Sequence, residues 1–214
     1  MTNTEIFAAL IAAGMTKEGA CGVLGNMAAE SAMRPNNAQD SYGIDDVTYT
    51  VKTDYGQNDF VNDCIGYGLC QWTERSRKQK LLAYAKNLGV SISDPHMQVS
   101  FCVIEMQTDY PAAWKVVTTS HDLLECTQIV LNAYENPAVK NLGTRMEYAQ
   151  QAYDYFVSGN CSEIQNSSPE EGKPPGGSAD TAPDISGALA MLAAYLQTDE
   201  FAENFKKYIE GESK

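Results

Sequence analysis

Capping signals and helical apolar spacing recur along residues 1–157 and limit this part of the chain to a mostly helical fold. Thr2 and Glu5 have the spacing of a capping box, in which each side chain accepts a backbone N–H at a helix start. Asp94 precedes Pro95, which combines a capping side chain with a proline at the first helical position. We therefore predict a mostly α fold.

The expected helices leave one stretch that departs from the pattern. Apolar spacing predicts helices at residues 1–15, 16–33, 76–88, 95–108, 111–117, 120–134 and 142–157. We expect Thr16 and Ser120 to cap the helices that they begin. Residues 40–66 instead mix aromatic and β-branched side chains with Asp, Asn and Gly, which predicts one long loop or a small hairpin. Long ordered loops often have a functional role.

A change of composition after residue 158 divides the chain into three parts. Residues 1–158 are predicted to form the main domain, and residues 159–184, rich in Ser, Gly, Pro and Glu, a flexible linker. Residues 185–214 carry the apolar stripes of two short helices. So short a segment buries too little surface to fold alone, so we expect it to pack on the main domain, on another molecule or on copies of itself. We favour a homo-oligomer.

The charge of the chain excludes several kinds of partner. The formal net charge is −13, from 15 Lys and Arg against 28 Asp and Glu. Such an acidic chain is a poor candidate for binding nucleic acid or anionic lipid through bulk charge. No stretch approaches the roughly 18 apolar residues of a membrane span, and residues 1–15 lack the basic start of a secretion signal. We expect no nucleic-acid partner and no membrane span.

The six cysteines and two histidines do not form a metal-binding pattern. No CxxC pair occurs, and His96 and His121 are isolated in the sequence. Cys21, Cys102 and Cys126 lie in apolar helical stretches, where a thiol packs as a small hydrophobic group. We predict reduced, buried thiols, no metal site and no cofactor.

Glu30 is the first candidate for chemistry, because it ends a helix of small residues. Gly22 and Gly25 lie one turn apart, which predicts close packing of that helix against a neighbour. Arg34-Pro35 ends the helix, so Glu30 lies at the negative end of the helix dipole, where a carboxylate is disfavoured. A carboxyl group that keeps its proton can donate it to a glycosidic oxygen. The alternative is a solvated glutamate at a helix end.

The second candidate is the glycine-rich turn Gly66-Tyr67-Gly68-Leu69-Cys70-Gln71-Trp72-Thr73. Its glycines allow a tight turn or the close approach of a ligand to the backbone. Gln71 offers hydrogen bonds and Trp72 a flat apolar face, which together suit an N-acetylated sugar. The alternative is a buried tight turn with a core tryptophan.

The third candidate is the helix end Tyr134-Glu135-Asn136-Pro137. Tyr134 could reach the acid from a neighbouring helix end, or it could pack in the core. We expect Arg145 to pair with Glu135 in a structural ion pair.

In this order, the three candidates resemble the motifs of the lysozyme-like superfamily of peptidoglycan-cleaving enzymes. More closely, the chain resembles the phage-tail-lysozyme family of bacteriophage lysins and prophages of Gram-positive bacteria. The matching segments are Gly25 to Ser31, Pro35-Asn36, Gly66 to Thr73, Arg77-Lys78, Tyr134 to Pro137, and Arg145. Cys70 departs from the family pattern, where a small residue such as alanine is usual, and we interpret it as structural.

The resemblance implies an α+β lysozyme-like fold with the substrate in a cleft and Glu30 as the general acid. We expect substrate contacts from Ser31, Tyr67, Gly68, Gln71, Trp72, Tyr134 and Glu135. The pattern supplies no clear second carboxylate, so Asp63 and Asp46 in the loop are the candidates for a base or an electrostatic stabiliser. Without one, the substrate's 2-acetamido group could attack the anomeric carbon, or the muramic 6-hydroxyl could close to a 1,6-anhydro product.

The activity implied is that of a bacteriolytic phage endolysin that hydrolyses the β-1,4 bond between N-acetylmuramic acid and N-acetylglucosamine in peptidoglycan. Such a protein would stay in the host cytoplasm until holin-dependent release and then act on the cell wall. The alternatives are a lytic transglycosylase, a glucosaminidase or chitinase-like enzyme, and a non-catalytic phage tail or wall-binding module. Residues 185–214 would then bind cell wall or form the oligomer.

Overall fold

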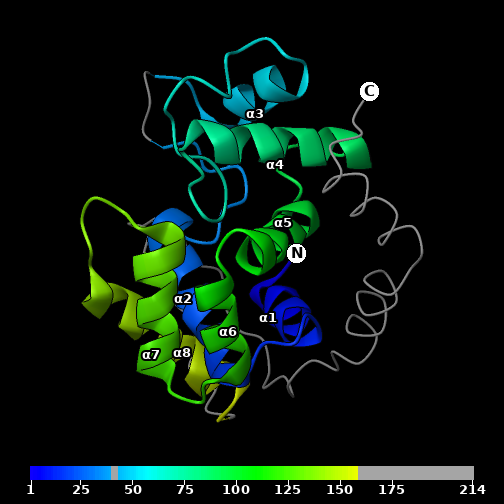
Figure 1. Cartoon of the computed structure of the whole chain (residues 1–214). Coiled ribbons are helices and arrows are strands. Elements are labelled where there is room, and N and C mark those ends of the chain that lie inside the picture. Colours follow the sequence, from blue (N-terminus) through cyan, green and yellow to red (C-terminus); the bar gives the residue numbers. More distant parts are fainter. Residues whose placement is uncertain (40–42, 159–214) are drawn as a thin grey trace, which may run out of the picture.

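The computed structural model describes residues 1–39 and 43–158, and this part of the chain is mostly helical, as predicted. The helices are α1 (Asn3–Ala12), α2 (Lys17–Ser31), α3 (Asp46–Asp54), α4 (Arg75–Leu88), α5 (Pro95–Thr108), α6 (Pro111–Thr119), α7 (Leu123–Ile129), the π-helix η1 (Val130–Glu135) and α8 (Leu142–Phe156). Figure 1 shows α2, α6, α7 and α8 grouped below α3 and α4, with α5 between the two groups. The predicted linker 159–184 and terminal segment 185–214 lie outside the described residues.

Most of the predicted capping residues begin their helices. Thr2, Thr16 and Asp94 each accept the backbone N–H three residues ahead. The prediction for Ser120 is wrong, because Ser120 is the C-terminal cap of α6. Asp122 caps α7 instead, since its carboxylate accepts two free backbone N–H groups of that helix at 2.8 and 3.1 Å.

The stretch 40–66 differs from the predicted loop or hairpin, because it contains helix α3. Asp45 caps this helix by accepting the Thr48 N–H at 2.9 Å. Within the described residues, β pairing is limited to the isolated bridges Ala38–Tyr67 and Tyr67–Trp72. The small non-helical part therefore centres on the glycine-rich turn.

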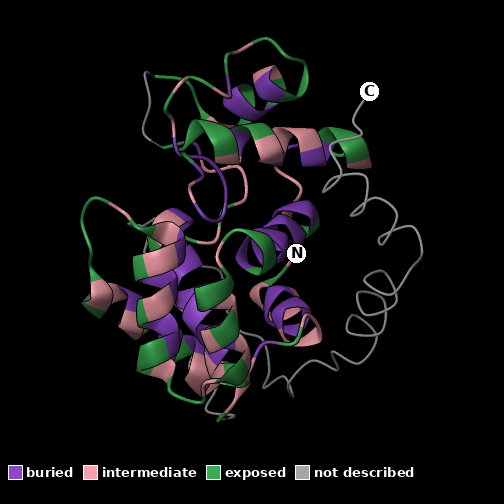
Figure 2. Cartoon of the chain, in the orientation of Figure 1, coloured by how far each residue is buried: buried purple, intermediate pink, exposed green. Residues whose placement is uncertain are grey.

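Helix α2 is the central element of the lower group and packs against α1, α6, α7 and α8. Its glycines allow this packing, as predicted. A Cβ added at Gly25 would lie 2.6 Å from the Arg145 carbonyl oxygen, and one at Gly22 would lie 2.9 Å from the Cys126 carbonyl carbon. Figure 2 shows α2 and α5 as largely buried helices. The close approach at Gly25 brings the start of α8 beside the last turns of α2.

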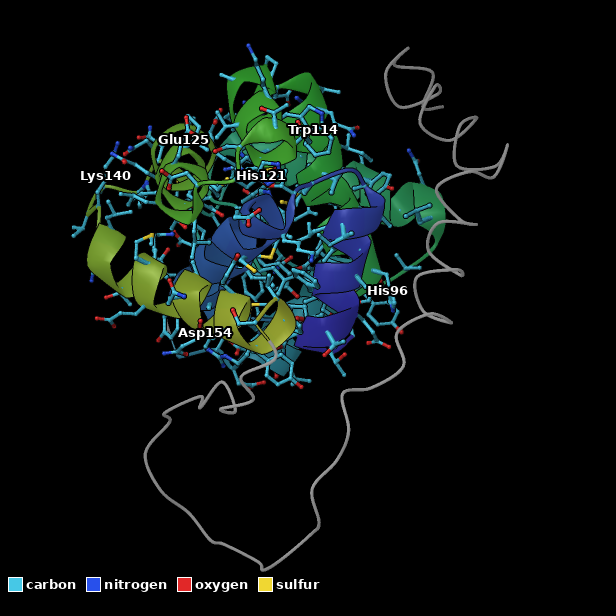
Figure 3. All side chains as sticks on the ribbon, turned by 90° about the horizontal axis from the view of Figure 1, so that it is seen from below. His96, Trp114, His121, Glu125, Lys140 and Asp154 are labelled. Atoms are coloured by element: carbon cyan, nitrogen blue, oxygen red, sulfur yellow. The ribbon has the colours of Figure 1, made fainter. Side chains whose placement is uncertain are left out.

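The described cysteines are free thiols. Cys21, Cys70, Cys102 and Cys126 are buried and Cys64 is exposed, whereas Cys161 lies beyond the described part. Figure 3 shows His96 and His121 well apart on the surface. In residues 1–39 and 43–158, no three His, Cys, Asp or Glu side chains gather as a metal ion would require. None of the described helices is both long and apolar enough to cross a membrane.

Candidate active site

A cavity of about 720 Å³ brings the three sequence candidates together. Glu30 lines it from the end of α2, Gln71 from the glycine-rich turn, and Tyr134 and Glu135 from the end of η1. Arg77, in the first turn of α4, also lines it. A cavity of this volume lies in the range of small-molecule binding sites.

Glu30 is held at the cavity by an arginine of α8. Its side chain is 16% exposed, and its Oε1 accepts a hydrogen bond of 2.6 Å from Arg145 Nη2. Arg145 is itself buried and donates through Nη1 to Asn26 Oδ1 at 2.9 Å. The expected pairing of Arg145 with Glu135 is therefore wrong, because α8 passes beside the end of α2. The ion pair holds the glutamate at the cavity, so it does not turn out into open water.

Glu105 of α5 is a buried carboxylate under the cavity that sequence reasoning missed. It is 1% exposed and accepts hydrogen bonds of 2.8 Å from Trp72 Nε1 and 2.8 Å from the Tyr134 hydroxyl. Arg77 donates to the same carboxylate through Nε at 3.0 Å and Nη2 at 2.8 Å. One signal was present, since Glu105 is the single charged residue in the apolar run 99–106.

The Glu105 network fixes the Tyr134 ring at the cavity wall. Its hydroxyl is engaged by Glu105, and the guanidinium carbon of Arg77 lies 4.6 Å from the ring centre. Burial raises the pKa of the Tyr134 hydroxyl well above its usual range. Tyr134 is only 1% exposed and its hydroxyl is already bonded, so it supports the cavity wall from the core, which corrects its predicted contact with substrate.

Glu135 ends η1, and its surroundings differ from those of Glu30. The π-helix closes at Asn136, a non-glycine residue with the left-handed φ of 42°. Single π turns are rare and are often found at functional sites. Burial raises the pKa of the Glu135 carboxyl well above its usual range, and the negative charge of Glu30 raises it further, while Arg77 and Arg145 act in the opposite direction.

Gln71 shapes the turn that forms another wall of the cavity. Its backbone adopts a positive φ of 45°, and its Nε2 donates to the carbonyl groups of Asn37 at 3.0 Å and Gly68 at 3.1 Å. A Cβ added at Gly66 would lie 2.8 Å from Gln71 Oε1. The amide is thus partly used to hold the turn, which leaves Oε1 as its remaining acceptor.

The aromatic rings of the turn belong to the core, which corrects their predicted contact with substrate. Trp72 and Tyr67 are both 0% exposed. Trp72 packs edge-on against Phe101, and the Tyr67 hydroxyl lies 2.6 Å from Thr50 Oγ1. A ring without exposed surface cannot stack on a sugar.

Ser31 and Gly68 also act inside the protein. The Ser31 hydroxyl donates to the carbonyl groups of Met27 at 3.0 Å and Leu69 at 3.1 Å, which ties α2 to the turn. Gly68 has a φ of 75°, and a Cβ there would lie 2.7 Å from Gln98 Oε1. Neither residue lines the cavity in the described part of the chain. Their expected contact with substrate becomes a positioning role.

The two loop aspartates lie outside the cavity as well. Asp63 forms an ion pair with the fully buried Lys78 and accepts a hydrogen bond of 2.6 Å from the Tyr49 hydroxyl. Asp46 pairs with Arg34 at 2.8 Å on a more exposed part of the surface. Both carboxylates hold the loop in place, and the glutamates that line the cavity are Glu30, Glu74 and the half-buried Glu135.

Together with its family match, the cavity between the glycine-rich turn and two helix ends identifies residues 1–156 as a lysozyme-type domain. The sequence matches the phage tail lysozyme family over residues 1–156, and the chain belongs to this family. It is also 29% identical over 151 residues to Morphogenesis protein 1 of Bacillus phage B103. The match covers 65% of this chain and 35% of that relative, so the chain spans about a third of the length of the relative.

Proposed function

We propose that the chain is a glycoside hydrolase that cleaves the β-1,4 bond between N-acetylmuramic acid and N-acetylglucosamine in bacterial peptidoglycan, with Glu30 as general acid. The observation that carries this proposal is the position of Glu30 in a cavity that it shares with Glu135. Glycoside hydrolysis commonly uses two carboxyl groups on either side of the bond that breaks. The phage tail lysozyme family supports peptidoglycan as the substrate.

The first experiment measures wall cleavage by the full chain and by Glu30→Gln. The amide keeps the shape of the side chain but has no acidic proton, so we expect the release of new reducing ends to fall by about 10²–10⁴-fold. Glu147→Gln is the matched control, because Glu147 is exposed on α8 and does not line the cavity. Wall cleavage by a folded Glu30→Gln protein at the wild-type rate would contradict the role of Glu30.

Mass spectrometry of the released fragments identifies the bond. Reducing ends on muramic acid support a muramidase, reducing ends on glucosamine a glucosaminidase, and 1,6-anhydro ends a lytic transglycosylase.

A phage tail or wall-binding module without catalysis is the second candidate. It is favoured by the name of the relative, which is a morphogenesis protein. This candidate predicts that the chain binds purified walls and releases no fragments, which the same assay detects. Holin-dependent release and wall binding by residues 185–214 remain part of the endolysin proposal. The homo-oligomer is tested by light scattering of the full chain against a 1–160 truncation, since equal numbers of chains per particle would contradict it.

A further inference from the structure

We propose that Glu135 is the second catalytic carboxyl group of the cavity and acts together with Glu30 on the glycosidic bond. This proposal rests on the proposed function. It replaces Asp63 and Asp46 as candidates for that role, because both of these aspartates are engaged in ion pairs outside the cavity.

The first argument is the shared position of the two glutamates. Glu30 ends α2 and Glu135 ends η1, and these two helices pack against each other. Both side chains line the same cavity. A sugar strand that fills this cavity would therefore meet these two carboxyl groups from two separate helix ends, whereas Glu74, the third glutamate of the lining, is exposed.

The second argument is the difference in their partners. Glu30 forms an ion pair of 2.6 Å with Arg145. Glu135 has neither a hydrogen bond nor an ion pair with the residues that the structure describes, although it is half-buried. Arg77 and Arg145 both act on Glu135 electrostatically, but Arg77 donates hydrogen bonds to Glu105 and Arg145 donates to Glu30 and Asn26. No protein donor in the described residues occupies the carboxyl oxygens of Glu135, so they are available to a ligand in the cavity.

The third argument is the backbone that presents Glu135. The π-helix directs Tyr134 down to Glu105 while its next residue, Glu135, lines the cavity. The helix then ends in the left-handed conformation of Asn136. Asparagine adopts this conformation readily at helix ends, so the π turn is the unusual feature here, and such turns are often found at functional sites.

The electrostatics agree with this geometry. The groups that act on Glu135 come from four helices: the charged side chains Glu30 from α2, Arg77 from α4 and Arg145 from α8, and the Cys102 thiol from α5. Burial and the charge of Glu30 raise the pKa of Glu135, and the two arginines oppose this. The protonated form of the Glu135 carboxyl is therefore favoured to a higher pH than that of an ordinary glutamate.

The chemical step needs one proton and one carboxylate. The pair donates its proton to the glycosidic oxygen as the bond from that oxygen to the anomeric carbon breaks. A water oxygen then bonds to the anomeric carbon, and the water gives one proton back to the pair. One water is consumed, one glycosidic bond is replaced by two hydroxyl groups, and the pair returns to its starting state.

The test compares Glu135→Gln with wild type on purified peptidoglycan. We expect kcat to fall by about 10²-fold or more, while the amount of protein bound to the walls is unchanged. The wild-type rate should fall as pH rises through the raised pKa of Glu135, because the pair then loses its proton. This alkaline limb should be absent or moved in Glu135→Gln, which a merely structural role would not do. If the two glutamates act as a unit, the effects of the two substitutions are not additive. The double variant Glu30→Gln/Glu135→Gln should then cleave walls about as fast as the slower of the two single variants.

If Glu135→Gln does not fold, a second variant, Glu135→Ala, tests the same role. Glu135→Ala removes the carboxyl group, and added formate should restore part of the lost rate by supplying one. Wild-type rates and an unchanged pH profile in Glu135→Gln, or a Glu135→Ala defect that formate does not relieve, would overturn the assignment. Failure of the proposed function is distinguishable, because the wild-type chain would then release no fragments at all.

Discussion

Two acidic regions meet at Tyr134, and they are built in opposite ways. Below the cavity, the Glu105 carboxylate accepts four hydrogen bonds, from Trp72, Tyr134 and twice from Arg77. At the cavity itself, Glu135 has no such donor among the described residues. Tyr134 and Glu135 are neighbours in η1. Tyr134 donates to a carboxylate that accepts four hydrogen bonds, whereas the Glu135 carboxyl group accepts none from the described residues.

The difference separates a structural role from a chemical one. A buried charge is tolerated where charged and neutral donors surround it, and the network then fixes its members in one arrangement. A carboxyl group that lacks hydrogen-bond donors and lies near a second carboxyl group destabilises the fold, but it is available to bind or react with a ligand. We infer that Glu105 holds the side of the cavity formed by Tyr134, beside Glu30 and Glu135.

Removal of Glu105 should give the largest loss of stability. Glu105→Ala leaves the guanidinium of Arg77 buried without its carboxylate and leaves two further donors without an acceptor. We expect the free energy of unfolding to fall by about 3–5 kcal/mol, measured by urea denaturation followed by circular dichroism.

The control for this prediction is Glu147→Ala, on the exposed face of α8. A surface substitution of this kind should change the free energy of unfolding by no more than about 0.5 kcal/mol. If Glu105→Ala and Glu147→Ala lowered the free energy of unfolding equally, the hydrogen bonds of Glu105 would not have the structural role that distinguishes it from Glu135.

Local signals explain which parts of the fold were predictable. Caps such as Thr16 and Asp94 act within one helical turn, so the sequence alone places those helix starts. The spacing of Gly22 and Gly25, one turn apart, predicted that α2 packs closely against a neighbour, although it did not identify the neighbour. Helix α3 was missed, because polar and β-branched residues weaken its apolar pattern and its cap, Asp45, resembles loop composition.

Contacts between distant residues explain the rest. Whether Trp72 faces a sugar or the core depends on Glu105, 33 residues away in the chain. The partner of Arg145 depends on the approach of α8 to α2, and not on its distance in sequence from Glu135. The three motifs located the cavity, but the assignment of their side chains to core or cavity required the packed structure.

Removal of the Tyr134 hydroxyl should have an intermediate effect. Tyr134→Phe deletes one hydrogen bond to the Glu105 carboxylate and keeps the ring beside Arg77. A hydrogen bond to a charged group contributes about 1.5–3 kcal/mol, so thermal or urea unfolding should show a loss in this range. Wall cleavage should decrease little, because the hydroxyl is already engaged away from substrate.

The opposite outcome would move the Tyr134 hydroxyl from the Glu105 network to the reacting groups of the cavity. If Tyr134→Phe keeps its stability and loses most of its wall cleavage, the hydroxyl belongs to the reaction and Glu105 would then position a catalytic group directly.

The smallest effect is expected at Asp46, the loop aspartate that the sequence offered as a base. Its ion pair with Arg34 involves a guanidinium side chain that is 56% exposed, and such pairs contribute about 0–1 kcal/mol. An asparagine can still accept the Ala38 N–H that Asp46 Oδ1 accepts at 3.1 Å. Asp46→Asn should therefore unfold and cleave walls like the wild type. A large loss of cleavage at unchanged stability would move the second carboxylate from η1 back to the loop, because the charge of Asp46 would then be needed by the reaction and not by the fold.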